Sequence, residues 1–176
     1  MILGMTTATL TLLHVLISLV GIGSGVVVMY GLVTSKRLDN WTALFLATTA
    51  LTSLSGFAFP NAHTTPGIVI GILSMIILTL AVVARYALRL KGSWRRIYIG
   101  AASLALYFNV FVLVVQSFEK VPALRALAPT QKEPPFAVVQ LTVLALFLVL
   151  TVLAVRRFHP ESSAKTLTPS EDRRAA

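Results

Sequence analysis

A small set of polar residues lies inside long apolar segments, where any side chain that can hydrogen-bond needs a partner. In lipid such a side chain faces protein, water or a ligand. Amides, hydroxyls and an imidazole are suited to holding a small polar or amphiphilic molecule through hydrogen bonds. The candidate ligand-binding residues are His14, Ser18, Ser53, Asn109, Gln116 and Gln140.

His14 has the widest chemical range of these residues. An imidazole can relay a proton, ligate haem iron or hydrogen-bond a quinone, and it can equally be a neutral group that bonds a neighbouring Ser, Asn or Gln. A bis-histidine haem needs a second histidine at matching depth, but His63 lies in a turn and His159 lies beyond the last apolar segment. The sequence therefore predicts no cofactor, and it leaves a haem- or quinone-associated redox subunit as an alternative.

The chain lacks the residue constellations that common catalytic and metal sites require. It has no cysteine, which excludes disulfides, thiol catalysis and Cys-ligated metals. No pair of carboxylates falls within an apolar segment, so acid–base hydrolysis and an oxygen-ligated metal site lack their groups. The net charge of +9 is distributed over turns and a tail, a pattern that does not favour nucleic-acid binding. We predict no catalytic residues and no metal site, and the sequence leans against an enzyme.

The segments that hold the polar residues are long enough to cross a membrane. The chain is 56% hydrophobic and 12% charged, whereas a soluble domain carries roughly 25% charged residues. We therefore predict an all-α membrane protein, with a bundle of five transmembrane helices within residues 1–157 and a charged tail at 158–176 whose composition predicts disorder. The spans are expected at about 7–33, 41–59, 67–88, 97–118 and 136–155.

The basic residues predict the orientation of this bundle. Twelve of the fifteen Lys and Arg residues fall in or beside the first turn, the third turn and the tail, and three fall in the fourth connection. Because positively charged loops remain in the cytoplasm, we place the C-terminal tail in the cytoplasm and the N-terminus outside. The expected location is the inner (plasma) membrane, with the lipid bilayer as the main partner.

With this orientation, the polar residues share a depth as well as a helix face. Projection at about 100° per residue places them on inward faces, and His14, Asn109 and Gln140 fall at middle or outer depth. We therefore predict an outward-facing pocket in the helix bundle. The connection at 119–135, which holds four prolines, is either a cap over this pocket or a plain connector. The candidate cap residues are His63, Glu119, Gln131 and Glu133.

Other polar and small residues have simpler interpretations. Gly21 and Gly25 are spaced as in helix-packing motifs of membrane bundles. Arg85 with Tyr86 is interpreted as an interfacial pair that reaches toward the cytoplasmic headgroups. An internal ion pair is the alternative for Arg85.

Three function classes fit these observations. The preferred one is a multi-pass membrane protein that binds or moves a small ligand of unknown identity. A homo-oligomer is compatible with this class. The others are the redox subunit above and a structural or assembly partner whose polar faces only pack helices. Small bacterial multi-pass proteins have this character, but no motif assigns the chain to a family.

Overall fold

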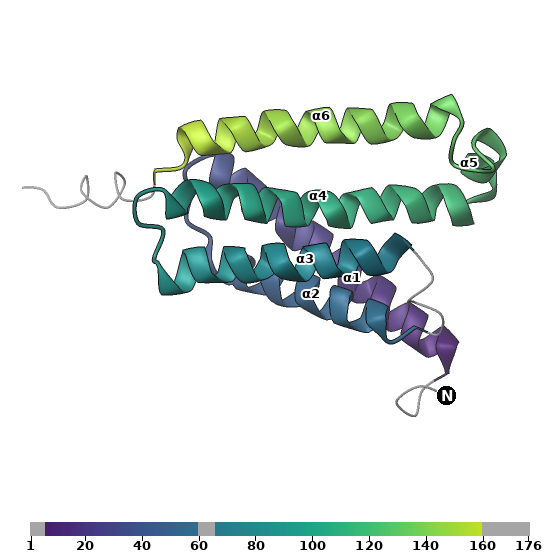
Figure 1. Ribbon diagram of the computed structural model, residues 1–176, viewed down its shortest axis with the longest axis horizontal. Helices are drawn as coiled ribbons and strands as arrows, with labels where there is room; N and C mark the ends of the chain where they lie inside the picture. The colour runs from purple at the N-terminus through teal and green to yellow at the C-terminus, as the bar shows by residue number, and fades with distance from the viewer. Residues whose placement is uncertain (1–5, 60–65, 160–176) are drawn as a thin grey trace, which may run out of the picture.

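The computed structural model describes residues 6–59 and 66–159, and all regular elements in these ranges are helices (Figure 1). The five long helices are α1 (Thr7–Val33), α2 (Asp39–Phe57), α3 (Pro66–Val82), α4 (Trp94–Lys120) and α6 (Pro134–Arg157). A π-helical turn, η2 (Val83–Ala87), continues α3, and a short helix, α5 (Pro122–Leu127), connects α4 to α6. His63 and residues 160–176 of the predicted tail lie outside the described residues.

Four of the described helices, α1, α3, α5 and α6, begin at residues suited to helix N-termini. The Thr6 hydroxyl accepts a hydrogen bond from the backbone N–H of Thr9 at 3.2 Å and caps α1. Proline is the first residue of α3, α5 and α6, where its missing N–H costs nothing because that group has no partner within the helix. Several hydroxyls inside the helices bond the carbonyl four residues earlier, as Ser24 does to Val20 at 2.7 Å. These hydroxyls are thereby satisfied without leaving their own helix.

Four helices in the described residues are long and apolar enough to cross a membrane. They are α1, the continuous helix Gly67–Ala87 formed by α3 and η2, α4 and α6. α2 is not among them, because it begins with Asp39 and Asn40 and carries further Thr and Ser residues. The fold is therefore an all-helical bundle with four helices suited to a membrane, and α2 is a more polar helix packed among them.

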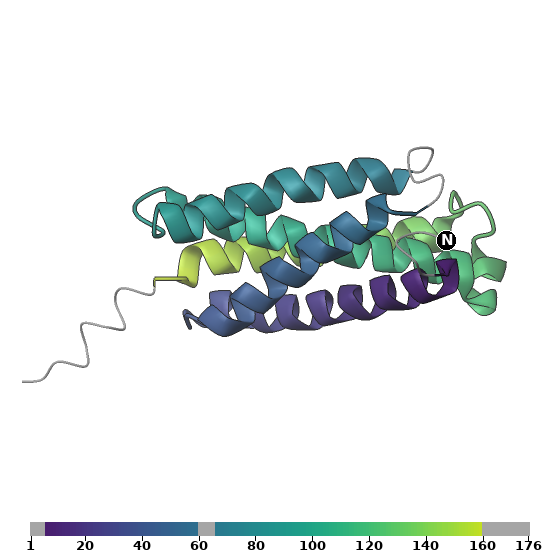
Figure 2. The same cartoon turned by 90° about the horizontal axis from the view of Figure 1, so that it is seen from below.

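α4 lies at the centre of the bundle. It packs against α1, α3 and α6, while α2 packs mainly against α1 and also against α3 (Figures 1 and 2). The long helices run between two opposite ends. At one end α1, η2 and α6 finish and α2 and α4 begin, and we call this the basic end. At the other, the α5 end, α4 leads into α5 and α6 begins.

The best-buried side chains lie where α1, α2 and α4 meet, toward the basic end. Phe45, Ile99 and Leu106 are each no more than 2% exposed. Gly25 of α1 allows this close approach, because a Cβ there would lie 2.5 Å from the Leu106 side chain and 2.9 Å from the Phe45 ring. The expected packing role of a small residue at this position follows from these distances.

Large apolar side chains also cover the outside of the bundle. Leu12 on α1, Ile76 on α3 and Leu141 on α6 are each 60% or more exposed. A water-soluble protein would not display apolar residues of this size along every long helix. Lipid is the solvent that fits such a surface.

Candidate functional site

The predicted ligand-binding residues of α1 are hydrogen-bonded to α2. His14 Nδ1 lies 2.8 Å from the Ser55 hydroxyl, and its ring makes an edge-to-face contact with Phe59 at 5.3 Å between centroids. One turn further along, the Ser18 hydroxyl donates to the His14 carbonyl at 2.6 Å and lies 3.4 Å from the Thr52 hydroxyl. Both residues are half-buried. They join α1 to the polar side of α2.

Asn109 of α4 reaches the same side of α2. Its amide nitrogen donates to the Thr49 hydroxyl at 3.0 Å. Thr49 and Ser55 are six residues apart, about 9 Å along a helix. His14, Ser18 and Asn109 therefore all contact hydroxyls within about two turns of α2, and we call this region the α2 seam. It consists of these three residues with Thr49, Thr52 and Ser55.

The other predicted ligand-binding residues lie away from the α2 seam. Gln140 of α6 is buried and donates to the Phe111 carbonyl of α4 at 3.2 Å, so it lies between α4 and α6. Gln116 of α4 is exposed, and Ser53 of α2 is buried. Gln140 therefore lies at the α4–α6 interface, whereas the α2 seam lies where α1 and α4 meet α2. A ligand role for each of them stays a prediction.

Two of the predicted cap residues line a hollow at the α5 end. Its volume is about 430 Å³, and its lining consists of Glu119, Lys120, Arg125, Pro129, Thr130 and Gln131. We call it the α5 hollow. Gln131 Nε2 donates to the Val115 carbonyl at 3.1 Å, which ties the loop after α5 to α4. Glu133, the third described cap residue, accepts a hydrogen bond from the Thr130 hydroxyl at 2.9 Å. These contacts hold the loop over the end of α4.

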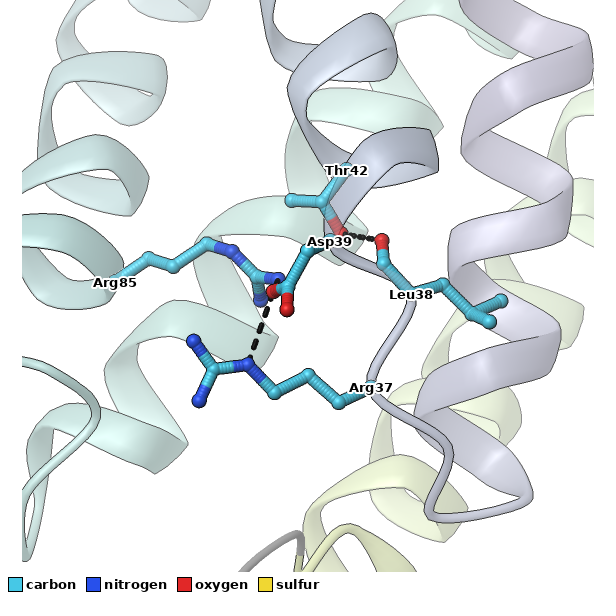
Figure 3. Close-up of polar contacts among 5 residues, drawn as sticks. All are labelled: Arg37, Leu38, Asp39, Thr42 and Arg85. Atoms are coloured by element: carbon cyan, nitrogen blue, oxygen red, sulfur yellow. Dashed lines mark hydrogen bonds and ion pairs between the residues drawn. The ribbon is translucent and has the colours of Figure 1, made fainter.

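A cluster of charged residues forms at the basic end (Figure 3). Asp39, the first residue of α2, accepts a hydrogen bond from Arg37 Nε at 2.9 Å. The same carboxylate oxygen accepts a hydrogen bond from Arg85 Nη2 of η2. The Arg85 guanidinium carbon also lies 5.1 Å from the ring centroid of Tyr98 on α4, within the range of a cation–π interaction. This cluster links the turn before α2, the end of α3 and the start of α4.

The two partners of this ion pair differ greatly in exposure. The Arg85 side chain is 2% exposed, whereas that of Asp39 is 60% exposed. The hydrogen bond from Arg37 lowers the pKa of Asp39; burial opposes this, and the charge of Arg85 lowers the pKa further. Asp39 therefore stays ionised and neutralises a buried arginine. Arg85 Nε and the Tyr98 hydroxyl are buried without a protein partner among the described residues.

The interfacial interpretation of Arg85 is replaced by its alternative, the internal ion pair. Arg85 lies within η2, and π-helical turns of this kind are frequent at functional sites. One signal in the sequence pointed to this pair. Among the described residues, Asp39 is the one acidic residue at the basic end, which makes it the candidate partner there for a buried arginine.

Comparison with known proteins gives no further assignment. No protein-family model matches the chain, and neither curated proteins nor solved structures show a significant match. The functional argument therefore depends on the residues and contacts above.

Proposed function

We propose that this chain is a five-span protein of the bacterial inner membrane that binds a small polar or amphiphilic ligand at its outer end. The fifth span would be α2. Its 19 residues extend about 28 Å, close to the thickness of the hydrocarbon core. Leu44, Leu51 and Leu54 form an exposed apolar stripe on it, while the hydroxyls of Thr49, Thr52 and Ser55 belong to the α2 seam. A helix with this division can meet lipid on one side and polar groups on the other.

The charges at the two ends support the proposed orientation. Among the described residues, the basic end carries nine Lys and Arg residues, while the α5 end carries three. Basic loops are retained in the cytoplasm. The basic end would then be cytoplasmic, and the α5 end would face outward.

The observation that carries the ligand proposal is the mixed lining of the α5 hollow. Glu119 offers a carboxylate, Lys120 and Arg125 offer cations, and Thr130 and Gln131 offer uncharged hydrogen-bonding groups. A molecule with one carboxylate and one ammonium group would meet an opposite charge at each end. We therefore propose a small zwitterion as the ligand class. This assigns binding to the α5 hollow, where the candidate cap residues lie, in place of the α2 seam.

The proposal is tested by thermal unfolding of the purified full chain with free amino acids, alkylamines and short organic acids as probes. Zwitterionic amino acids should raise the Tm more than the singly charged probes. At a hundredfold excess over Kd, the bound amino acid should stabilise the folded chain by about 2.7 kcal/mol. E119Q and R125Q should abolish the shift, and R89Q/K91Q at the basic end should retain it. A shift that survives R125Q, or equal responses to all probes, would refute the proposal.

A structural or assembly role is the second candidate, and the α2 seam favours it. His14 and Asn109 each bond a hydroxyl of α2, which is the arrangement expected of side chains that only pack helices. A double-mutant cycle of His14→Ala and Ser55→Ala should then give a coupling of about 0.6 kcal/mol, typical of hydrogen bonds between membrane helices. In this case no probe at the α5 hollow would alter stability.

A further inference from the structure

The turn between η2 and α4 forms a second hollow, at the basic end. Its volume is about 490 Å³, and its lining consists of Ala87, Leu88, Arg89, Lys91 and Trp94. We call it the α3–α4 hollow. The lining thus combines two exposed cations, a half-buried indole and two apolar residues. This composition differs from that of the α5 hollow because its lining contains no carboxylate.

The backbone of this turn holds the two cations in place. Arg89 and Leu90 adopt left-handed conformations, with φ of 50° and 58°. Such conformations are costly for residues other than glycine and persist where the surrounding structure enforces them. The Leu90 N–H bonds the Ala84 carbonyl at 3.0 Å, and its side chain is 7% exposed. Leu90 therefore anchors the turn in the bundle, and its neighbours Arg89 and Lys91 are left at the surface.

The charge of the hollow is not neutralised within the described part of the chain. Both ion pairs found there involve Asp39, whose carboxylate is already shared by Arg37 and Arg85. Arg95 and Arg96 of α4 follow directly and add to the positive potential. An anionic partner is the chemistry that this surface would attract.

Depth and neighbouring surface indicate which anion fits. The hollow lies at the end of two apolar helices, where the phosphate groups of a bilayer would be found. Val82, Val83 and Tyr86, just before it in the chain, are 41%, 39% and 52% exposed. They offer an apolar surface beside the cations, and Trp94 is a typical residue of the membrane interface. A phosphate attached to acyl chains would contact both the cations and the apolar surface beside them. A soluble anion would contact the cations alone.

We propose that the α3–α4 hollow binds the phosphate headgroup of an anionic phospholipid. Arg89 and Lys91 contact the phosphate, Trp94 packs against the glycerol region, and the exposed apolar residues of η2 contact an acyl chain. Basic sites at the cytoplasmic ends of membrane helices recognise lipid headgroups in this manner. This inference is independent of the ligand proposed for the α5 hollow.

The test measures binding of phosphatidylglycerol to the full chain, reconstituted in phosphatidylcholine nanodiscs, by native mass spectrometry and lipid titration. Each cation near an anionic surface contributes roughly fivefold, so R89Q/K91Q should weaken binding by about 25-fold. The matched control, K120Q/R125Q, removes two cations from the opposite end and should bind as the unmodified chain does. Thermal unfolding in phosphatidylcholine alone should be the same for both variants, which shows that both are folded.

Three outcomes would overturn the proposal. The first is equal lipid binding by R89Q/K91Q and K120Q/R125Q. The second is displacement of the lipid by inorganic phosphate at comparable concentration, which would assign the hollow to a soluble anion. The third is lipid binding that appears only in E161Q/E171Q/D172N, which would show that acids of the chain's own tail occupy the hollow.

Discussion

Arg85 is a buried arginine whose charge depends on one carboxylate. It donates to Asp39 with one nitrogen, while its Nε has no partner among the described residues. A buried polar group without a partner costs about 1–3 kcal/mol, and more when it is charged. The bond to Asp39 therefore compensates only part of the cost of burying Arg85. Removing the Asp39 carboxylate should lower the stability of the folded protein strongly, whereas removing Arg37, which is 55% exposed, should lower it little.

Asp39→Asn should destabilise the protein by about 1–3 kcal/mol, because a charge-assisted hydrogen bond to a buried cation becomes a neutral one. Arg37→Gln, the matched control, should cost less than about 1 kcal/mol, as for an exposed ion pair. Unfolding in detergent at neutral pH measures both. Equal effects of the two substitutions would contradict the central position of Asp39.

The same substitution should alter the dependence of stability on pH. The pKa of Asp39 is lower in the folded protein than its usual value of 3.8, so the unfolded chain takes up a proton first as the pH falls. The contribution of the ionised carboxylate is fully present above pH 3.8 and is lost below it, through the lowered pKa. Asp39→Asn should lack this loss of stability at acidic pH, as unfolding measured from about pH 6 down to about pH 2 would show.

At the scale of the helices, small residues of α1 and hydroxyls of α2 allow α2 to pack closely against its neighbours. Gly21 of α1 lies against α2, where an added Cβ would be 3.3 Å from the Thr48 hydroxyl and 3.5 Å from that of Thr49. Gly25 lies where α2 and α4 both approach α1. The more polar helix is thus held against its neighbours by close backbone approach and by the hydrogen bonds of the α2 seam. In lipid, where the hydrophobic effect does not drive helices together, these are the available forces.

Gly25→Ala should destabilise the bundle by about 1–3 kcal/mol, because the new methyl group overpacks the Phe45 ring and Leu106. Gly23→Ala is a suitable control on the same helix. An added Cβ there meets no described atom within 4 Å, so it should change stability little or raise it by up to about 1 kcal/mol. Thermal unfolding of both variants tests this, and equal stabilities would argue against close packing at Gly25.

At the scale of the molecule, apolar helix surface lies between two charged ends. The basic end carries more Lys and Arg residues than the α5 end. The hollow at the basic end is likewise the more positively charged of the two. The α5 hollow contains Glu119 beside its cations, whereas the lining of the α3–α4 hollow is cationic and apolar. The number of crossings decides which ends of the helices share a side of the membrane.

Labelling of single cysteines can count the crossings, because the chain has no cysteine of its own. If α2 and α3 both cross, Asn40→Cys and Ser93→Cys should react with an impermeant reagent only after permeabilisation, while Ala126→Cys should react in intact cells. A chain in which α2 does not cross would place positions 40 and 93 on opposite sides. That result would refute the five-span proposal and retain the four apolar spans.

The sequence by itself determined that the chain forms long apolar helices and that its cations gather at one end. Apolar segments in lipid must satisfy their backbone groups internally, so a helix is the structure open to each of them. Because the helical period follows from the residues of one segment, the sequence also placed His14, Ser18, Ser53, Asn109 and Gln140 on inward faces, but it placed Gln116 there too, and Gln116 is exposed. The partners of those residues were decided by the tertiary structure. His14 bonds Ser55, 41 positions away, and Arg85 bonds Asp39, 46 positions away. Such pairs depend on how neighbouring helices are rotated and spaced, and on the π-helical turn at η2, none of which is encoded in the periodicity of a single helix.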